Sequence, residues 1–177
     1  MSQERCFAMF GGWRIGLYRL FVALAAGAML GACATGPALV VHTFSFDARQ
    51  DSPDVEILDY RYGDSRQPGA RAEPERVAQG RIGQQWSVSG AMLRGDFLFV
   101  KWRIKKTGQI YEDTVNLTAR LPADISNHDI HFVVNGPRLY VYLVSPERRP
   151  PDMPANGPRR YSESKVFTIY PDQPKTK

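Results

Sequence analysis

The sequence lacks most of the motifs that reveal a chemistry. Its 177 residues contain two cysteines and three histidines. The segment Ser87-Val88-Ser89-Gly90 does not fit the Gly-x-Ser-x-Gly pattern of a nucleophile elbow. No glycine-rich phosphate loop precedes a helix, and no internal repeat is present. These absences remove the common signatures of hydrolases and nucleotide-binding proteins, and they lead us to expect no cofactor and no nucleic acid.

The first 32 residues have the composition of a signal peptide. Three arginines and one glutamate make the extreme N-terminus basic, and residues 20–30 (LFVALAAGAML) form an uncharged apolar run of eleven residues. A membrane-spanning helix needs roughly 20 such residues, whereas a signal-peptide core needs about 7–15. We therefore predict that residues 1–32 are a leader and set them aside in the fold argument.

The leader ends in Leu30-Gly31-Ala32-Cys33, which places two small residues directly before a cysteine. This stretch resembles the lipobox of bacterial lipoproteins. The resemblance implies that the Cys33 thiol carries a diacylglyceryl group, that the leader is cut off before Cys33, and that the new amino group is acylated. Ala34 stands where an aspartate tends to retain such proteins in the inner membrane, so the resemblance implies the outer membrane, with the domain facing the periplasm. A plain secretory leader is the alternative.

Lipidation would leave the mature domain without a free cysteine, because Cys6 is lost with the leader. Disulfides, thiol catalysis and cysteine-ligated zinc are then excluded. The 145 residues that remain carry 20 basic and 17 acidic side chains, a net charge of +3, which does not indicate nucleic acid. The mature sequence also resembles proteobacterial lipoproteins of no known activity.

The mature chain consists of short β-type segments separated by turns. We predict strands at residues 38–46, 55–62, 97–104, 109–117, 130–134, 139–144 and 165–170, with a short one at 86–89, and a helical turn started by Pro74. The expected fold is all-β, a single antiparallel β-sandwich, with an open β-barrel as the alternative. The domain would span residues 38–171, after a tether at 33–37 and before a polar tail at 172–177.

Two hairpins have a predicted register. In the first, Ile104 is expected opposite Tyr111, which also places Arg103 opposite Glu112. In the second, Val134 is expected opposite Leu139. These registers place Val100 and Trp102 in the core, with Lys101 and Arg103 on the other face.

No residue set in the mature chain predicts a catalytic or metal site. His128 and His131 lie three apart at the start of a predicted strand, and a strand points positions i and i+3 to opposite faces, which works against chelation. We expect them, like His42, to be surface histidines. Asp51, Asp54, Asp59 and Asp64 are expected to be solvated charges, since no pair of them is selected by spacing.

Two features suggest a contact surface instead. Tyr60 and Tyr62, like Tyr140 and Tyr142, share one face of a predicted strand, and tyrosine provides contact area at low entropic cost. Residues 145–162 form a proline-rich loop that contains Arg148, Arg149, Arg159 and Arg160. We expect the prolines to keep this loop extended, so that the arginines meet phosphate head groups or an acidic partner.

The function expected from these observations is that of a non-enzymatic binding or assembly module, held at the outer membrane by a lipid on Cys33. A protein partner in the envelope follows from this expectation. The alternatives are an immunity or inhibitor lipoprotein directed against an envelope-targeting toxin, an accessory lipoprotein of a secretion system and, less favoured, an envelope enzyme.

Overall fold

A computed structural model describes residues 38–172 of the chain. The predicted leader, the lipidation site at Cys33, the tether and the last five residues of the predicted tail lie outside the described residues. Within residues 38–172, no helix is long and apolar enough to cross a membrane.

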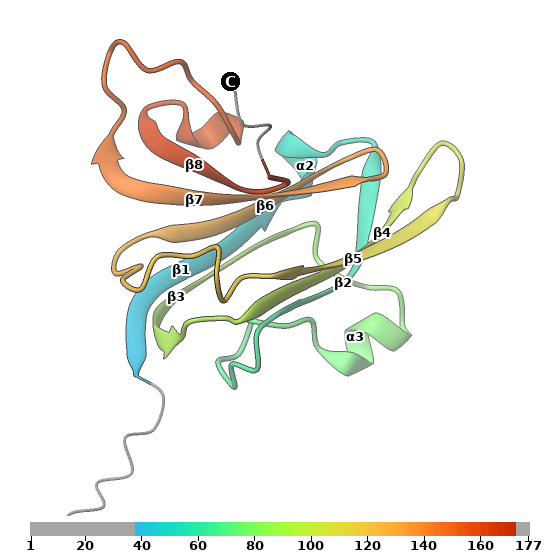
Figure 1. The fold of residues 1–177 in the computed structure, drawn as a ribbon. Helices are drawn as coiled ribbons and strands as arrows, with labels where there is room; N and C mark the ends of the chain where they lie inside the picture. Colours follow the sequence, from blue (N-terminus) through green and yellow to red (C-terminus); the bar gives the residue numbers. More distant parts are fainter. Residues whose placement is uncertain (1–37, 173–177) are drawn as a thin grey trace, which may run out of the picture. The chain divides into compact units, whose positions relative to one another are not determined.

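The strands form two sheets that pack face to face (Figure 1). The five-stranded sheet contains, in spatial order, β3 (Gln85–Leu93), β1 (Leu39–Asp47), β6 (Asp129–Asn135), β7 (Arg138–Arg148) and β8 (Ser164–Tyr170). The three-stranded sheet contains β2 (Val55–Tyr62), β4 (Phe97–Ile104) and β5 (Ile110–Asn116). This arrangement confirms the expected all-β sandwich.

One strand pair departs from the expected antiparallel pattern. β1 and β6 run parallel, with Ser45 opposite His131 and Phe46 opposite Phe132. A parallel pair needs a long connection between its strands, and here the whole of the three-stranded sheet lies between them in sequence. This pairing brings together polar residues that are more than 80 positions apart in the chain.

Three short helical segments connect the strands: α2 (Ala48–Asp51), α3 (Pro74–Ala78) and the 3-10 turn η2 (Arg159–Tyr161). α3 begins with proline at its first turn, as predicted. α2 was not predicted, because its segment is acidic and rich in turn residues. It forms because the Asp47 side chain accepts hydrogen bonds from the backbone N–H groups of Arg49 and Gln50.

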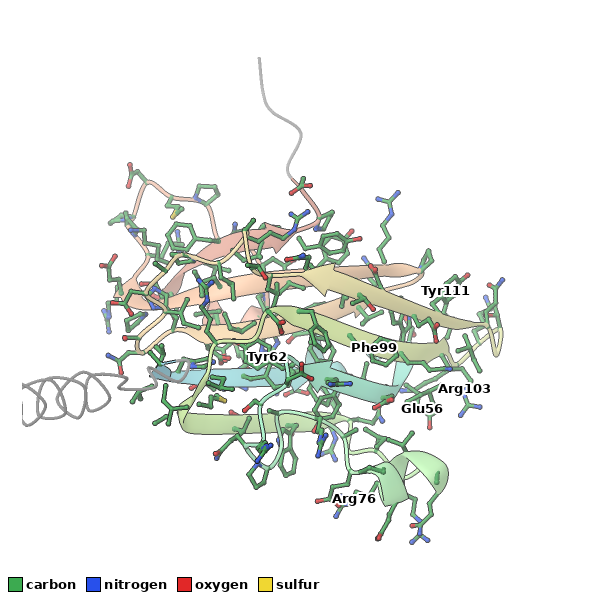
Figure 2. The ribbon with its side chains drawn as sticks, turned by 60° about the horizontal axis from the view of Figure 1, so that its bottom comes forward. Glu56, Tyr62, Arg76, Phe99, Arg103 and Tyr111 are labelled. Carbon is green, nitrogen blue, oxygen red and sulfur yellow. The ribbon has the colours of Figure 1, made fainter. Side chains whose placement is uncertain are left out.

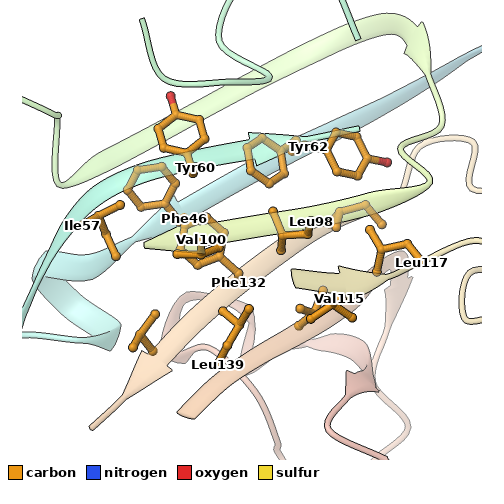
Figure 3. Packing of buried hydrophobic residues seen from close by; sticks show 14 of the residues in the cluster. Phe46, Ile57, Tyr60, Tyr62, Leu98, Val100, Val115, Leu117, Phe132 and Leu139 are labelled. Atoms are coloured by element: carbon orange, nitrogen blue, oxygen red, sulfur yellow. The ribbon is translucent and has the colours of Figure 1, made fainter. Parts of the chain in front are cut away.

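The core lies between the inner faces of the two sheets (Figure 3). The rings of Phe44 and Tyr62 stack at 4.9 Å between centroids, and those of Phe46 and Phe132 at 4.7 Å. The buried Trp102 of β4 donates a 2.9 Å hydrogen bond to the Gly136 carbonyl in the β6–β7 turn, which joins the two sheets. Trp102 and Val100 are buried and Lys101 and Arg103 lie on the other face, as predicted.

The two predicted registers have different outcomes. Val134 lies opposite Leu139, as predicted. Tyr111, however, lies opposite Trp102 and not Ile104, so the prediction for the β4–β5 hairpin is wrong by two residues. Ile104 instead closes the turn, since its carbonyl accepts from the Gly108 N–H and its own N–H donates to the Gln109 carbonyl. Gly108 ends this four-residue turn with a φ of +73°, which favours glycine.

Candidate functional site

A groove lies on the outer face of the three-stranded sheet. Strand alternation buries Leu98, Val100 and Trp102, so Phe97 and Phe99 of β4 point outward. We name this hollow, of about 630 Å³, the α3 groove. Its lining comprises Asp59, Tyr60, Arg61, Arg71, Ala72, Pro74, Val77, Ala78, Phe97, Phe99 and Thr114. Figure 2 views the side chains from this side, with Phe99 on the sheet and Arg76 on α3.

The position of α3 follows from the chain that precedes it. Residues 70–72 lie along the free edge of β2, where the Tyr62 N–H donates to the Ala70 carbonyl at 2.7 Å and the Ala72 N–H to the Tyr60 carbonyl at 2.9 Å. The chain then enters α3 at Pro74, which places the apolar side chains of Pro74 and Val77 beside the groove. One wall of the groove is therefore fixed by backbone hydrogen bonds to the sheet.

The polar groups of the groove are mostly charges of both signs. The Arg61 guanidinium lies 5.2 Å from the centroid of the Phe97 ring and forms an ion pair with Asp64. Burial raises the pKa of the Asp59 carboxyl, although Lys101 and Arg61 act in the opposite direction. Arg71 is exposed and has no ion-pair partner within residues 38–172. The lining combines these charges with the apolar side chains of Phe97, Phe99 and Val77.

A second set of polar residues lies on the outer face of the five-stranded sheet. We name Ser45, Asp51, Asp129, His131 and Tyr161 the outer-face polar cluster. Ser45 Oγ lies 2.8 Å from Nδ1 of His131, and Nε2 of His131 lies 3.3 Å from an Asp51 carboxylate oxygen. The parallel β1–β6 pair places the serine beside the histidine, α2 supplies Asp51, and η2 supplies Tyr161, which donates to Asp129.

The cluster contains the residues of a serine hydrolase triad but not its geometry. Ser45 and His131 are both 0% exposed. The Ser45 hydroxyl also lies 2.8 and 2.9 Å from the two carboxylate oxygens of Asp129. A hydroxyl has one hydrogen, so a Ser45 hydroxyl that donates to Asp129 cannot also donate to His131 Nδ1, as general-base activation requires. The arrangement therefore suits a buried hydrogen-bonded support.

The charges of this cluster are stabilised by its own donors. Burial opposes ionisation of Asp51, but hydrogen bonds from His131 and from the Arg159 backbone N–H outweigh it and lower the pKa of the carboxyl. Burial and the adjacent Asp129 carboxylate raise the pKa of Tyr161, which keeps its phenol protonated as a donor. Among residues 38–172, no buried side-chain nitrogen or oxygen lacks a hydrogen-bond partner.

A third set of polar residues, the pair His42 and Tyr62, lies in the core. His42 Nδ1 donates to the Val40 carbonyl at 2.8 Å, and Nε2 lies 3.0 Å from the Tyr62 hydroxyl, from which it accepts. Burial lowers the pKa of His42 and raises that of Tyr62 to about 12. The prediction of surface histidines is thus wrong for His42 and His131, which are buried, while His128 is half-buried.

The tyrosines predicted as contact residues separate into two groups. Tyr60 and Tyr62 are buried in the core, so they do not form an exposed tyrosine face, although Tyr60 contributes to the lining of the α3 groove. Tyr140 and Tyr142 are half-buried on the outer face of the five-stranded sheet. The loop after β7 covers part of this face. Its Gly157 lies so close to Tyr142 that a Cβ added to the glycine would be 3.3 Å from the tyrosine ring.

The arginine-rich loop does not stay extended, which corrects the prediction. Residues 145–148 continue β7, and the loop then returns over the sheet through η2. Arg149 is directed into the loop, where it donates to the carbonyls of Met153 and Ser162. Arg148, Arg159 and Arg160 are exposed. The fold therefore divides the four arginines into one internal residue and three exposed ones.

No group of three or more His, Cys, Asp or Glu side chains within residues 38–172 is placed to hold a metal ion. Comparison with protein-family models, curated proteins and solved structures gave no match for this chain. The fold class therefore rests on the geometry alone. The protein is an all-β sandwich with an open groove on one outer face and a buried polar cluster on the other.

Sequence reasoning missed both the α3 groove and the outer-face polar cluster. A signal for the groove was present, since Phe97 and Phe99 have the same strand parity as Lys101 and Arg103, on the face predicted to be polar. No local signal existed for the cluster, because its serine and histidine meet only through a non-local parallel pair.

Proposed function

We propose that the chain is a lipid-anchored, non-enzymatic binding module of the cell envelope, and that its α3 groove holds a segment of a protein partner. The observation that carries this proposal is the pair of outward phenylalanines, Phe97 and Phe99, on the floor of an open hollow. Exposed apolar hollows with a polar rim are typical of interaction sites. The lipobox at Cys33 supports the location, and the outer membrane follows from the resemblance.

The groove favours an extended segment with apolar side chains. Phe97, Phe99 and Val77 provide apolar contact area, while Arg71 at the rim offers a planar donor for a carboxylate or a backbone carbonyl. The fixed wall made by residues 70–72 and α3 reduces the ordering that binding requires. Aromatic side chains in such positions usually dominate the binding free energy.

Photocrosslinking tests this proposal in the native envelope. A photoreactive phenylalanine analogue replaces Phe99 in one variant and Thr107, at the exposed tip of the β4–β5 turn, in the control. We expect a discrete crosslinked protein from position 99 that is absent from position 107. Equal crosslinking at both positions, or none at position 99, would contradict the assignment of the groove.

An enzyme is the rival function, because Ser45, His131 and Asp51 are residues of a hydrolase. The complete burial of Ser45 and His131 and the donation from Ser45 to Asp129 favour the structural role. A fluorophosphonate probe, which reacts with activated serines, distinguishes the two functions. We expect no labelling of the folded chain, and labelling at Ser45 would support the enzyme.

A further inference from the structure

The first strand of the domain begins with two aliphatic side chains on its outer face. Leu39 is 63% exposed and Val41 is 53% exposed, the two highest values among the large exposed hydrophobic residues. The buried neighbours Phe44 and Phe46 have the opposite parity on β1, so neither Leu39 nor Val41 can join the core.

The neighbouring edge strand extends this apolar surface. Leu93 of β3 lies opposite Leu39, and Ala91 lies opposite Val41, so all four side chains share one face. We name Leu39, Val41, Ala91 and Leu93 the β1 apolar patch. A hollow of about 390 Å³ adjoins it, lined by Leu39, Ala91, Met92 and Leu93 on the apolar side and by residues 64–67 on the polar side.

The patch lies at the end of the domain where the chain arrives from Cys33. Only five peptide units separate Cys33 from Ala38, which at full extension span at most roughly 18 Å. A lipid on Cys33 would therefore hold the start of β1 close to the bilayer. This step rests on the proposed lipid anchor.

We propose that the β1 apolar patch inserts into the interface of the phospholipid bilayer that holds the anchor. Leu39 and Val41 enter the region between head groups and acyl chains, where aliphatic side chains are favourable. Arg66, which lines the adjoining hollow and is exposed, pairs with lipid phosphate. The domain is thereby oriented on the membrane as well as tethered to it.

The sheet sets a limit on the depth of insertion. β3 is an edge strand of its sheet, and unpaired backbone N–H and C=O groups are not tolerated in hydrocarbon. The side chains of the patch therefore enter while the strand stays at the head-group level. A second copy is a poorer occupant, since a specific interface buries more than about 1,000 Å² in total, which four side chains do not supply.

Site-specific labelling tests this orientation on the processed chain reconstituted into anionic vesicles. The Cys33 thiol is consumed by the anchor, so V41C introduces the single free thiol of the mature chain. The matched control is I110C, since Ile110 is 52% exposed and belongs to the β4–β5 hairpin, away from the start of β1 (Figure 1). Each variant carries a nitrobenzoxadiazole dye, and the vesicles contain a spin-labelled lipid as quencher.

We expect quenching of the V41C dye to exceed that of the I110C dye at least several-fold, with a blue-shifted emission at V41C alone. Adding Leu39→Ser to V41C should reduce the quenching, and unchanged thermal unfolding would show that the fold is intact. Equal quenching at both positions overturns the proposal. So does a V41C signal that depends on the surface density of the chain and not on the quencher, because a second copy would then cover the patch.

Different results would contradict the proposed lipid anchor and the proposed orientation on the membrane. Absence of the acyl mass on Cys33 would remove the proposed lipid anchor, whatever the dyes report. An acylated chain whose V41C dye remains in water would retain the anchor and overturn only the orientation. Intact-mass measurement of the same samples separates these two outcomes.

Discussion

Ser45 is the residue that connects most parts of the outer-face polar cluster. Its hydroxyl lies within hydrogen-bonding distance of Asp129 and His131, and through them it joins β1 and β6 to α2 and η2. Ser45→Ala leaves these buried partners short of one hydrogen bond, which costs about 1–3 kcal/mol of unfolding free energy. Urea denaturation monitored by tryptophan fluorescence measures this cost.

Ser87 provides a matched control for Ser45. It lies directly opposite Ser45 on β3, at the same level of the sheet, but it is exposed. Ser87→Ala is expected to change the unfolding free energy by no more than about 0.5 kcal/mol. Equal effects of the two substitutions would show that the buried hydrogen bonds of Ser45 contribute nothing specific.

His42 makes stability depend on pH. Burial lowers its pKa in the folded state, so the unfolded chain binds a proton more readily as the pH falls below 6.5. The unfolding free energy is therefore fully retained above pH 6.5 and decreases as the pH falls toward the lower folded pKa. The hydrogen bond from His42 to the Val40 carbonyl and the charge of Asp129 act in the opposite direction and only moderate the shift in the pKa of His42.

His42→Gln removes this titration and should flatten the fall in unfolding free energy between pH 6.5 and 5. His128→Gln, which also deletes one imidazole but at a half-buried position, is the matched control. Urea midpoints measured across this range give both slopes. An unaltered slope in His42→Gln would place the pH dependence elsewhere.

Asp51 affects the unfolding free energy in a separate, more acidic pH range. Its pKa is lowered in the folded state, so its contribution to stability is lost as the pH falls below the ordinary value of 3.8.

At the scale of the strand, sequence predicts faces better than partners. The segments 55–62 and 97–104 form strands with the predicted bounds, because their apolar residues are dense and end at clear turns. The β4–β5 register is wrong by two residues because side-chain alternation has a period of two. It therefore fixes which face a residue occupies but not the slip along the strand.

The ion pairs of β4 show the consequence of the two-residue error in register. Glu112 pairs with Lys101 at 3.3 Å, not with Arg103 as predicted. Arg103 instead binds Glu56 of β2 at 2.7 Å. A hairpin considered alone cannot reveal a partner on a third strand. The outer-face polar cluster could not be predicted from the sequence for the same reason, because the β1–β6 pairing has no local signature.

The returning loop after β7 can be tested with two adjacent arginines. Arg149 donates from its side chain to the carbonyls of Met153 and Ser162, whereas its neighbour Arg148 is exposed. Arg149→Gln should increase amide hydrogen exchange across residues 150–162 and lower the unfolding free energy by about 1–2 kcal/mol. Arg148→Gln should leave both quantities unchanged. Comparable loosening in both variants would return the loop to the extended state first predicted.

For the whole molecule, the sandwich separates three surfaces that do not compete. The α3 groove uses the outer face of one sheet, and the outer-face polar cluster holds the returning loop on the outer face of the other. The β1 apolar patch lies at the start of the first strand, on the same sheet as the cluster. A domain oriented by the patch would remain close to its membrane while its groove stays open to a partner.

The proposed lipid anchor would decide where the whole molecule resides, and two cysteines allow a matched test of it. Cys33→Ser removes the thiol of the predicted lipobox, whereas Cys6→Ser changes the other cysteine of the chain, inside the predicted leader. Several acyl chains on one residue hold a protein firmly, since each buried methylene contributes about 0.8 kcal/mol. We therefore expect Cys33→Ser to leave the leader uncut or to release the protein from membranes, and Cys6→Ser to behave as the parent chain. Membrane fractionation and intact mass report both outcomes, and a Cys33→Ser chain that retains the parent's mass and its outer-membrane location would contradict the lipid anchor.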